Sequence, residues 1–379
     1  MERGVIPSSS VGNKINLWYD YIRRFAVPDA EVLRKEVQDE IHRMEENQDL
    51  LLYYGLMEFR HRLMLDYLDP LIDSDYRPGP SELLENLEHK QSKITGLLDY
   101  YYNFFQGMYE FDNREYIEAI KYYKNAEKAL SFVSDEIEKA EFYFKIAELY
   151  YHMKQTYVSM YYAKQAYDIY KEQVTYQIRT IQCHFVLAGN FMDLNNYDQA
   201  MRHFEKAFEM SKKEQQSQLI GRSLFNKGLC FHNQEQDQAA AENIEKAVSV
   251  FEEGGIIRSL PQAYFLLAQI RFKHKDEQAE EAFKKGQGYA EQLGDSVYSV
   301  KFELLRSLYQ SDPDDKGIEK SLLYLQSKKL YPDIEDLALE VAKHYSEQKN
   351  YKMATSYFLK VEEARKQTLR GDCLYEIEK

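Results

Sequence analysis

The sequence contains few of the residues that mark secreted, metal-binding or membrane-spanning proteins. Its three cysteines, Cys183, Cys230 and Cys373, lie far apart without a Cys-x-x-Cys pair, so we expect buried or idle thiols in a reducing compartment. No stretch of about 18 apolar residues occurs, which argues against a membrane-spanning helix. Residues 1–7 lack the apolar core of a signal peptide. We therefore expect a cytoplasmic protein.

Proline is also scarce, and basic charge is in deficit. The 379 residues include only eight prolines but 33 tyrosines and 20 phenylalanines. Few helix breakers and many large aromatic rings favour long packed helices, as in an α-solenoid. The net charge is −14, and so acidic a surface repels nucleic-acid phosphates and anionic lipids. We expect no direct nucleic-acid partner and no membrane partner, whereas a basic peptide or basic protein patch would be attracted.

Small and aromatic residues recur along the chain with a period near 40 residues. The closing alanines of four successive units are Ala126, Ala166, Ala207 and Ala247. Small residues let two helices approach closely, while Tyr or Phe fills the adjoining groove, as in tetratricopeptide repeats. Their commonest period is ~34 residues, so the helices or linkers here are longer. A degenerate stretch covers residues 295–330. We predict about seven helical pairs between residues 96 and 370.

Upstream of the repeats, the sequence predicts a three-helix bundle. The first helix is amphipathic and covers residues 11–25. The second opens at Pro28-Asp29, since the fixed φ of proline suits a first helical turn and Asp29 complements the helix dipole. The polar segment Asn47-Gln48-Asp49 separates the second helix from a third helix over residues 50–68.

The domain division follows from a proline-rich segment. Residues 69–95 include Asp69-Pro70 and Arg77-Pro78-Gly79-Pro80, and prolines at this density stop helices. We therefore predict an all-α protein in three parts. An N-terminal three-helix bundle occupies residues 1–68, a linker with a helix residues 69–95, and a superhelical tetratricopeptide-repeat array residues 96–379.

The search for catalytic motifs leaves one candidate. The sequence has no nucleotide-binding loop, no dinucleotide-binding glycine run and no HExxH motif, and its nine histidines form no i, i+4 pair. We expect no metal and no cofactor. The polar run around Gln48 has two interpretations. It could simply cap the third helix, or the Gln48 amide could stand exposed at the helix break, enter a partner and orient a water for attack on a phosphoryl group.

Three polar residues lie on predicted first helices of the repeat pairs. Asn190 and Asp193 are three residues apart on one helix, and Asn226 lies on the equivalent helix one repeat later. An asparagine can bridge the N–H and C=O of an extended peptide, and Asp193 would select a basic side chain. Hydrogen bonds between helices are the alternative role of these residues.

A more specific resemblance is carried by seven segments. They are Lys14–Tyr19, Met44–Leu50, Met57–His61, Thr95–Leu98, Gly107–Phe111, Ile137–Phe142 and Met153–Thr156. Through these segments the chain resembles, from about Ile6 to Ile377, the Rap family of bacilli, response-regulator aspartate phosphatases controlled by Phr peptides.

The resemblance implies a two-state switch. The N-terminal bundle and linker of the family bind response regulators. Some members dephosphorylate the response regulator of the sporulation phosphorelay with a glutamine that corresponds to Gln48. Others hold the DNA-binding domain of the competence regulator ComA off DNA. An imported Phr pentapeptide binds the concave face of the repeats and draws the bundle into the array. The residues around Gln48 that we expect to bind the partner are Glu45, Glu46, Asn47, Asp49 and Leu50.

The same resemblance implies the peptide contacts. Asp193 corresponds to the contact for a basic peptide residue and Asn226 to a contact with the peptide backbone, with Asn190 beside them. One departure is Asn47, because many relatives have an aspartate there and this chain lacks that charge beside Gln48.

Two segments look most like the ComA-binding subgroup. They are Ser259–Phe265, which includes the further expected peptide contacts Gln262 and Tyr264, and the ending Leu374–Glu378. Our first hypothesis is therefore a quorum-sensing regulator that sequesters ComA. Binding of its Phr peptide would inhibit the regulator and free ComA. The alternative is a phospho-aspartate phosphatase acting on the sporulation phosphorelay regulator through Gln48. A repeat scaffold with neither activity is the third, so the sequence leaves open whether the protein is an enzyme.

Overall fold

The computed structural model describes residues 5–68 and 96–370. Within these residues the chain forms 17 α-helices and no strand, with one isolated bridge between Ile6 and Met44. The predicted all-α fold is therefore confirmed. The predicted linker at residues 69–95, Cys373 and the ending at 374–378 lie outside the described residues. None of the described helices combines the length and apolar character that a bilayer crossing requires.

The chain divides into two compact units. The first comprises Met1–Lys145 with Ile169–Tyr176, and the second Ile146–Asp168 with Gln177–Lys379. Two of the three division points fall inside helices, α7 (Glu136–His152) and α8 (Thr156–Tyr170), and the third lies between Tyr176 and Gln177. The three-part division that we predict from the sequence, with boundaries at residues 68 and 95, stays a prediction.

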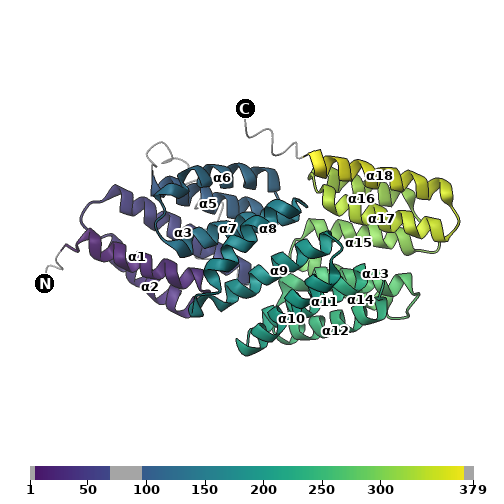
Figure 1. Cartoon of the computed structure of the whole chain (residues 1–379), viewed down its shortest axis with the longest axis horizontal. Helices are drawn as coiled ribbons and strands as arrows, with labels where there is room; N and C mark the ends of the chain where they lie inside the picture. The colour runs from purple at the N-terminus through teal and green to yellow at the C-terminus, as the bar shows by residue number, and fades with distance from the viewer. Residues whose placement is uncertain (1–4, 69–95, 371–379) are drawn as a thin grey trace. The chain divides into compact units, whose positions relative to one another are not determined.

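The first unit begins with the expected three helices. They are α1 (Ser8–Arg23), α2 (Val27–Ile41) and α3 (Gln48–Leu68). The apolar face of α1 is buried, and its Trp18 is fully enclosed, donating from Nε1 to His61 Nδ1 of α3 at 3.0 Å. Pro28 stands in the first turn of α2, where its missing N–H would have no helical partner. The helices pack on one another as a bundle, drawn in purple and blue (Figure 1).

The same unit contains the first repeat pair, α5 (Leu97–Asp112) and α6 (Tyr116–Ala129). The two helices approach closely at Gly107, where an added Cβ would lie 2.4 Å from Cδ1 of Tyr123. This contact is the reason for the small and aromatic residues at these repeat positions, because only glycine leaves room for the buried ring.

The second unit continues the array (Figure 1). After α8 its pairs are α9 (Gln177–Asp193) with α10 (Tyr197–Lys213), α11 (Ser217–Asn233) with α12 (Asp237–Glu253), α13 (Leu260–Lys273) with α14 (Ala279–Gln292), α15 (Ser296–Tyr309) with α16 (Asp315–Ser327), and α17 (Tyr331–Glu347) with α18 (Tyr351–Arg370). With α5/α6 and α7/α8 the described pairs number seven, as predicted. The closing alanines Ala126, Ala166, Ala207 and Ala247 are all fully buried.

The degenerate stretch at residues 295–330 also forms a repeat pair, α15 with α16. Asp295 caps α15 by accepting the backbone N–H groups of Val297 and Tyr298. Phe302 is fully buried, and its ring meets Phe283 of α14 edge-on, with ring centroids 5.4 Å apart. The pair also has a close contact between small residues, since a Cβ added at Gly317 of α16 would lie 2.3 Å from Ser307 Oγ of α15.

Candidate functional site

The first candidate site is the junction between α2 and α3. Asn47 caps α3, since its Oδ1 accepts the backbone N–H of Leu50 at 3.0 Å. The helix therefore starts at Gln48, two residues before the predicted Leu50. Asp49 lies in the first turn, where its charge complements the helix dipole. Of the two interpretations of this polar run, capping of the third helix therefore applies to Asn47.

The loop before this cap is held by the N-terminal segment. Ile6 donates its N–H to the Arg43 carbonyl at 3.0 Å and accepts the Glu45 N–H at 3.0 Å. The Glu45 carboxylate accepts the backbone N–H of Ser8, the first residue of α1, at 3.3 Å. Glu45 is therefore partly occupied in tying the loop to α1, whereas Glu46 stays exposed beside it.

Gln48 projects from the start of α3 into solvent. Its side chain is exposed, and its Nε2 donates to Glu46 Oε1 at 3.3 Å across the surface. The amide oxygen has no hydrogen-bond partner among the described residues, so both a donor and an acceptor can be offered to a partner. This placement matches the exposed amide that we predict; its chemical role stays a prediction.

A groove runs beside the junction within the first unit. Its lining combines Asn47, Asp49 and Leu50 with residues of α1, α3 and α5 and with Asp135. Leu97, at the start of α5, is 43% exposed there. Three of the six expected partner-binding and catalytic residues therefore face one groove, and the exposed Glu46 and Gln48 adjoin it in sequence.

Beneath this groove lies a buried charged cluster that sequence reasoning missed. Glu138 of α7 has no exposed surface. Its carboxylate accepts hydrogen bonds from the hydroxyl groups of Tyr19 at 3.0 Å and Tyr100 at 2.9 Å. Arg23 of α1 donates to Glu138 at 3.3 Å and to Asp135 at 2.7 Å. Burial raises the pKa of Glu138, and Arg23 and the two hydroxyls oppose that rise. We call these five residues the Glu138 cluster.

The Glu138 cluster joins helices that are distant in sequence. It connects α1 to α5 and to the first turns of α7, all within the first unit. Each charge has a partner of opposite sign or a hydroxyl donor, so the cluster fixes geometry rather than offering a free group. The segment Ile137–Phe142 was a mark of the resemblance, but no local pattern indicated that Glu138 would be buried.

The second candidate site lies on the repeats. Asn190 of α9 has no exposed surface; its Nδ2 donates to Ser159 Oγ at 2.7 Å and to the Val186 carbonyl at 2.9 Å. Ser159 in turn donates to the Ala147 carbonyl at 2.9 Å. Asn190 therefore makes the hydrogen bonds between helices that were its alternative role, while its Oδ1 has no partner among the described residues.

Asp193 and Asn226 are placed differently from Asn190. Asp193, the last residue of α9, is exposed and forms no ion pair with any described residue. Lost hydration raises its pKa to about 6, helped by Asp336 and Glu335 and opposed by Lys154 and Thr156. The half-buried Asn226 of α11 has a side chain without a hydrogen-bond partner in the part of the chain that the structure describes. Both groups can accept a ligand.

The two expected residues of α13 divide between surface and core. Gln262 is exposed in the first turn and has no side-chain hydrogen bond to described residues. Tyr264 is buried, and its hydroxyl donates to Glu252 Oε1 at 2.7 Å while its ring stacks on Tyr289. Tyr264 thus packs α13 against its neighbours. No described hydrogen bond or ion pair joins the five expected peptide residues to one another.

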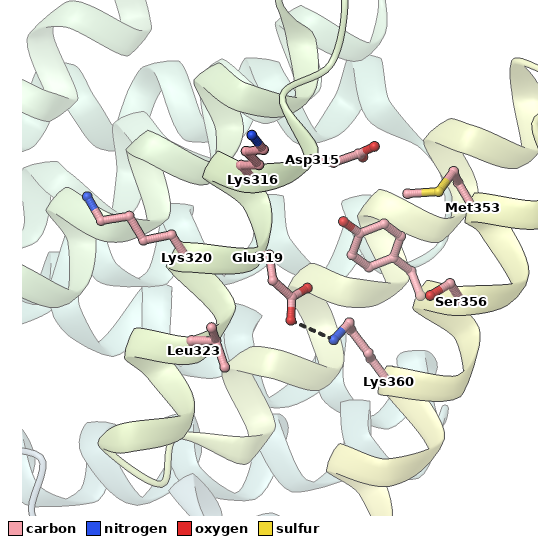
Figure 2. Close-up of a pocket in the computed structure, with 9 residues that line it drawn as sticks. Asp315, Lys316, Glu319, Lys320, Leu323, Met353, Ser356 and Lys360 are labelled. Atoms are coloured by element: carbon pink, nitrogen blue, oxygen red, sulfur yellow. Dashed lines mark hydrogen bonds and ion pairs between the residues drawn. The ribbon is translucent and has the colours of Figure 1, made fainter.

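Another groove, between α16 and α18, contains none of the expected residues (Figure 2). Its walls alternate lysines with carboxylates, and Lys360 Nζ bridges to Glu319 Oε1 at 2.9 Å. The apolar part comprises Leu323, Met353 and Tyr357. This is the pattern of two solvated helix faces, and it supplies no catalytic constellation.

Two segments of the chain match known family models. Residues 5–66 match the family model described as response regulator aspartate phosphatase H, N terminal. Residues 181–214 match the tetratricopeptide repeat model. The first match covers the predicted bundle, and the second covers α9 and α10.

Relatives match over the full length. The chain is 58% identical to regulatory protein RapC of Bacillus subtilis (strain 168) over 381 residues, covering 100% of both chains. It is 54% identical to regulatory protein RapF of the same strain over 378 residues, covering 99% of each. The solved structure of a Rap protein complexed with competence and sporulation factor is 39% identical, covers 96% of this chain and 99% of its own, and has a TM-score of 0.91.

Proposed function

The chain belongs to the Rap family, and from this premise we propose that it is a peptide-controlled regulator that binds a response regulator through its N-terminal bundle. The observation that carries the proposal is full-length identity of 54% and 58% to two regulatory proteins of the family. Its action is cytoplasmic, where response regulators and an imported peptide meet.

The partner in this proposal is the DNA-binding domain of ComA. The junction between α2 and α3 offers Glu46, Gln48 and Asp49 as exposed polar groups beside the groove that Leu50 and Leu97 line. An acidic, amide-bearing surface suits a DNA-binding domain, because such domains carry basic residues that otherwise contact phosphate. Occupying that basic surface blocks DNA binding.

The signal in this proposal is a Phr pentapeptide bound by the repeats. Asp193 receives the basic side chain of the peptide, and Asn226 receives its backbone N–H and C=O. Support comes from an exposed carboxylate without an ion pair to any described residue and from an amide without a described hydrogen bond. A related Rap protein, 39% identical, has been solved with competence and sporulation factor.

A gel-shift titration tests the partner. Full-length protein added to ComA on its promoter DNA is expected to remove the protein–DNA band. Glu46→Lys, a charge reversal at an exposed position of the junction, is expected to weaken this inhibition. Lys360→Met, which breaks an ion pair between α16 and α18, serves as the matched control. Undiminished DNA binding at excess wild-type protein would overturn the proposal.

A second function is favoured by the exposed amide of Gln48. In this alternative Gln48 orients a water against the phospho-aspartate of the sporulation phosphorelay regulator. The water oxygen bonds to phosphorus, the P–O bond to the aspartyl carboxylate breaks, and inorganic phosphate is released. Incubating the phosphorylated regulator with wild type and Gln48→Ala tests this, and equal phosphate loss in both would exclude the role of Gln48. A protein inactive in both assays and insensitive to peptide would be a repeat scaffold.

A further inference from the structure

The groove beside the α2–α3 junction is larger than the expected partner-binding residues alone would form. Its volume is about 690 Å³, which lies within the range of about 300–1,000 Å³ that is usual for binding pockets. Part of its lining comes from α5 and from the residue before α7, namely Leu97, Leu98, Tyr101 and Asp135. The groove therefore extends from the three-helix bundle onto the first repeat pair, within the first unit.

The charges around this groove are unequal in number. Asp49 is exposed in the first turn of α3 and forms no ion pair with a described residue. Asp135, with a side chain 49% exposed, holds Arg23 at 2.7 Å, and Arg23 also pairs with the buried Glu138 at 3.3 Å. The one guanidinium thus already has two carboxylate partners, and Asp49 adds a further negative charge at the rim. Such an excess of negative charge attracts a cation.

The uncharged part of the lining selects among cations. The rings of Tyr53 and Tyr101 lie with their centroids 5.6 Å apart, and the Tyr53 hydroxyl donates to Asn16 Oδ1 at 3.0 Å, which holds its ring in place. Leu50 and Leu97 add apolar surface. A planar guanidinium stacks on aromatic faces while its methylene stem covers apolar side chains, whereas a lysine ammonium is a compact and strongly hydrated charge. The lining therefore suits arginine better than lysine.

We propose that this groove receives an arginine side chain of the bound response regulator, with the guanidinium at Asp49 and the stem on Leu50 and Leu97. The proposal rests on the partner-binding function proposed above and extends the contact from the junction onto α5. Two arguments support this occupant. The negative charge complements the basic surface with which a DNA-binding domain contacts phosphate, and Asp49 and Leu50 belong both to the groove and to the expected partner surface.

The chain offers a matched control for Asp49. Asp198 is also exposed, also stands in the first turn of a helix, α10, and also follows an asparagine cap, since Asn196 accepts the backbone N–H of Gln199 at 3.3 Å. Asp198 does not line the groove. Both carboxylates complement a helix dipole in the same way. A difference between the two substitutions therefore reports on the groove and not on the end of a helix.

The first experiment tests the groove without any protein partner. N-acetyl-arginine amide is titrated into the full-length protein and followed by ligand-observed nuclear magnetic resonance, with N-acetyl-citrulline amide as the uncharged isostere. The arginine compound is expected to bind wild type more tightly than the citrulline compound. Asp49→Asn is expected to weaken its binding about fivefold, and Asp198→Asn is expected to leave it unchanged. Equal binding of the two compounds, no binding of either, or the same affinity in wild type and Asp49→Asn would overturn the proposal.

The second experiment uses the DNA-binding domain of ComA in a calorimetric titration with the full-length protein. Asp49→Asn is expected to weaken binding about tenfold. Leu97→Ser, which removes apolar surface for the stem, is expected to weaken it roughly threefold. The controls Asp198→Asn and Leu323→Ser, the latter at a leucine of α16 that is 55% exposed, are expected to bind as wild type does.

The two experiments separate the groove from the identity of the partner. Wild-type affinity for the domain in both Asp49→Asn and Leu97→Ser would overturn the proposal. If wild type does not bind the domain but binds the arginine compound in a manner that depends on Asp49, the arginine site stands and ComA fails as the partner. All four substitutions are at exposed side chains, so thermal unfolding is expected to be nearly unchanged.

Discussion

Each compact unit contains a cluster in which basic and acidic side chains meet, and the two clusters differ in burial. In the first unit Arg23 and Glu138 have side chains only 10% and 1% exposed, and every charge has a partner. In the second unit Lys154, which pairs with Asp336, is half-buried and Asp336 is exposed, with side chains 26% and 73% accessible, and Asp193 has no ion pair to a described residue. A buried charge without a partner is costly, whereas an exposed charge can stay unpaired at little cost and be offered to a ligand.

The largest effect is expected where the buried cluster is broken. Glu138→Gln keeps the shape but removes the negative charge facing Arg23, so the free energy of unfolding should fall by about 3 kcal/mol. Chemical denaturation of the full chain measures this. The matched change Glu319→Gln removes the partner of an exposed ion pair, and a similar loss in both variants would contradict the contrast between the clusters.

The next effect concerns the side-chain amide of Asn226. Asn226→Ala removes both hydrogen bonds proposed for the peptide backbone, so peptide affinity should fall by about 1.5–3 kcal/mol, or roughly 10- to 100-fold. Calorimetric titration measures this. Binding of the response regulator should be unchanged in the same variant. Normal peptide affinity in this variant would show that the peptide binds elsewhere.

The affinity for a cationic peptide should depend on pH through Asp193. The pKa of Asp193 is raised to about 6, so its carboxylate is neutral below that pH and charged above it. Affinity for a cationic peptide should therefore fall by up to about tenfold as pH drops from 7 to 5. Asp193→Asn should bind weakly with no such dependence. A pH dependence that persists in Asp193→Asn would assign it to another group.

The smallest stability effect is expected at the junction, outside the buried cluster. Gln48→Ala should change the free energy of unfolding by less than about 0.5 kcal/mol, because its side chain makes one exposed hydrogen bond. If the phosphatase alternative holds, the same change abolishes phosphate release. Destabilisation comparable to that of Glu138→Gln would mean that Gln48 has a structural role.

Much of the fold could be predicted because repeat patterns are local. The alanines spaced about 40 residues apart are buried where helices meet, and the proline at position 28 opens α2. The start of α3 was misplaced by two residues, since the Asn47 cap extends the helix to Gln48. Residues 295–330 depart from the spacing of the other repeats but still form a pair, because Gly317 lets α16 approach Ser307 of α15 and the buried Phe302 packs on Phe283.

The candidate sites were predicted less evenly. The exposed Gln48, Asp193 and Gln262 are placed where a ligand can reach them, while Asn190 and Tyr264 are enclosed and bonded to neighbouring helices. Glu138 and Lys154 lie in segments that the resemblance marked, but nothing in those segments indicates their partners. Burial and pairing of a charge depend on side chains that come from other helices.

The sequence by itself determined the helices and their pairing, because the periodicity of apolar and small residues is local to each helix. It also determined the acidic character of the chain, which follows from composition alone. Only the tertiary structure decided that Arg23 meets Glu138 and that Lys154 meets Asp336. Such contacts depend on the accumulated rotation of successive helical pairs, which no short segment encodes.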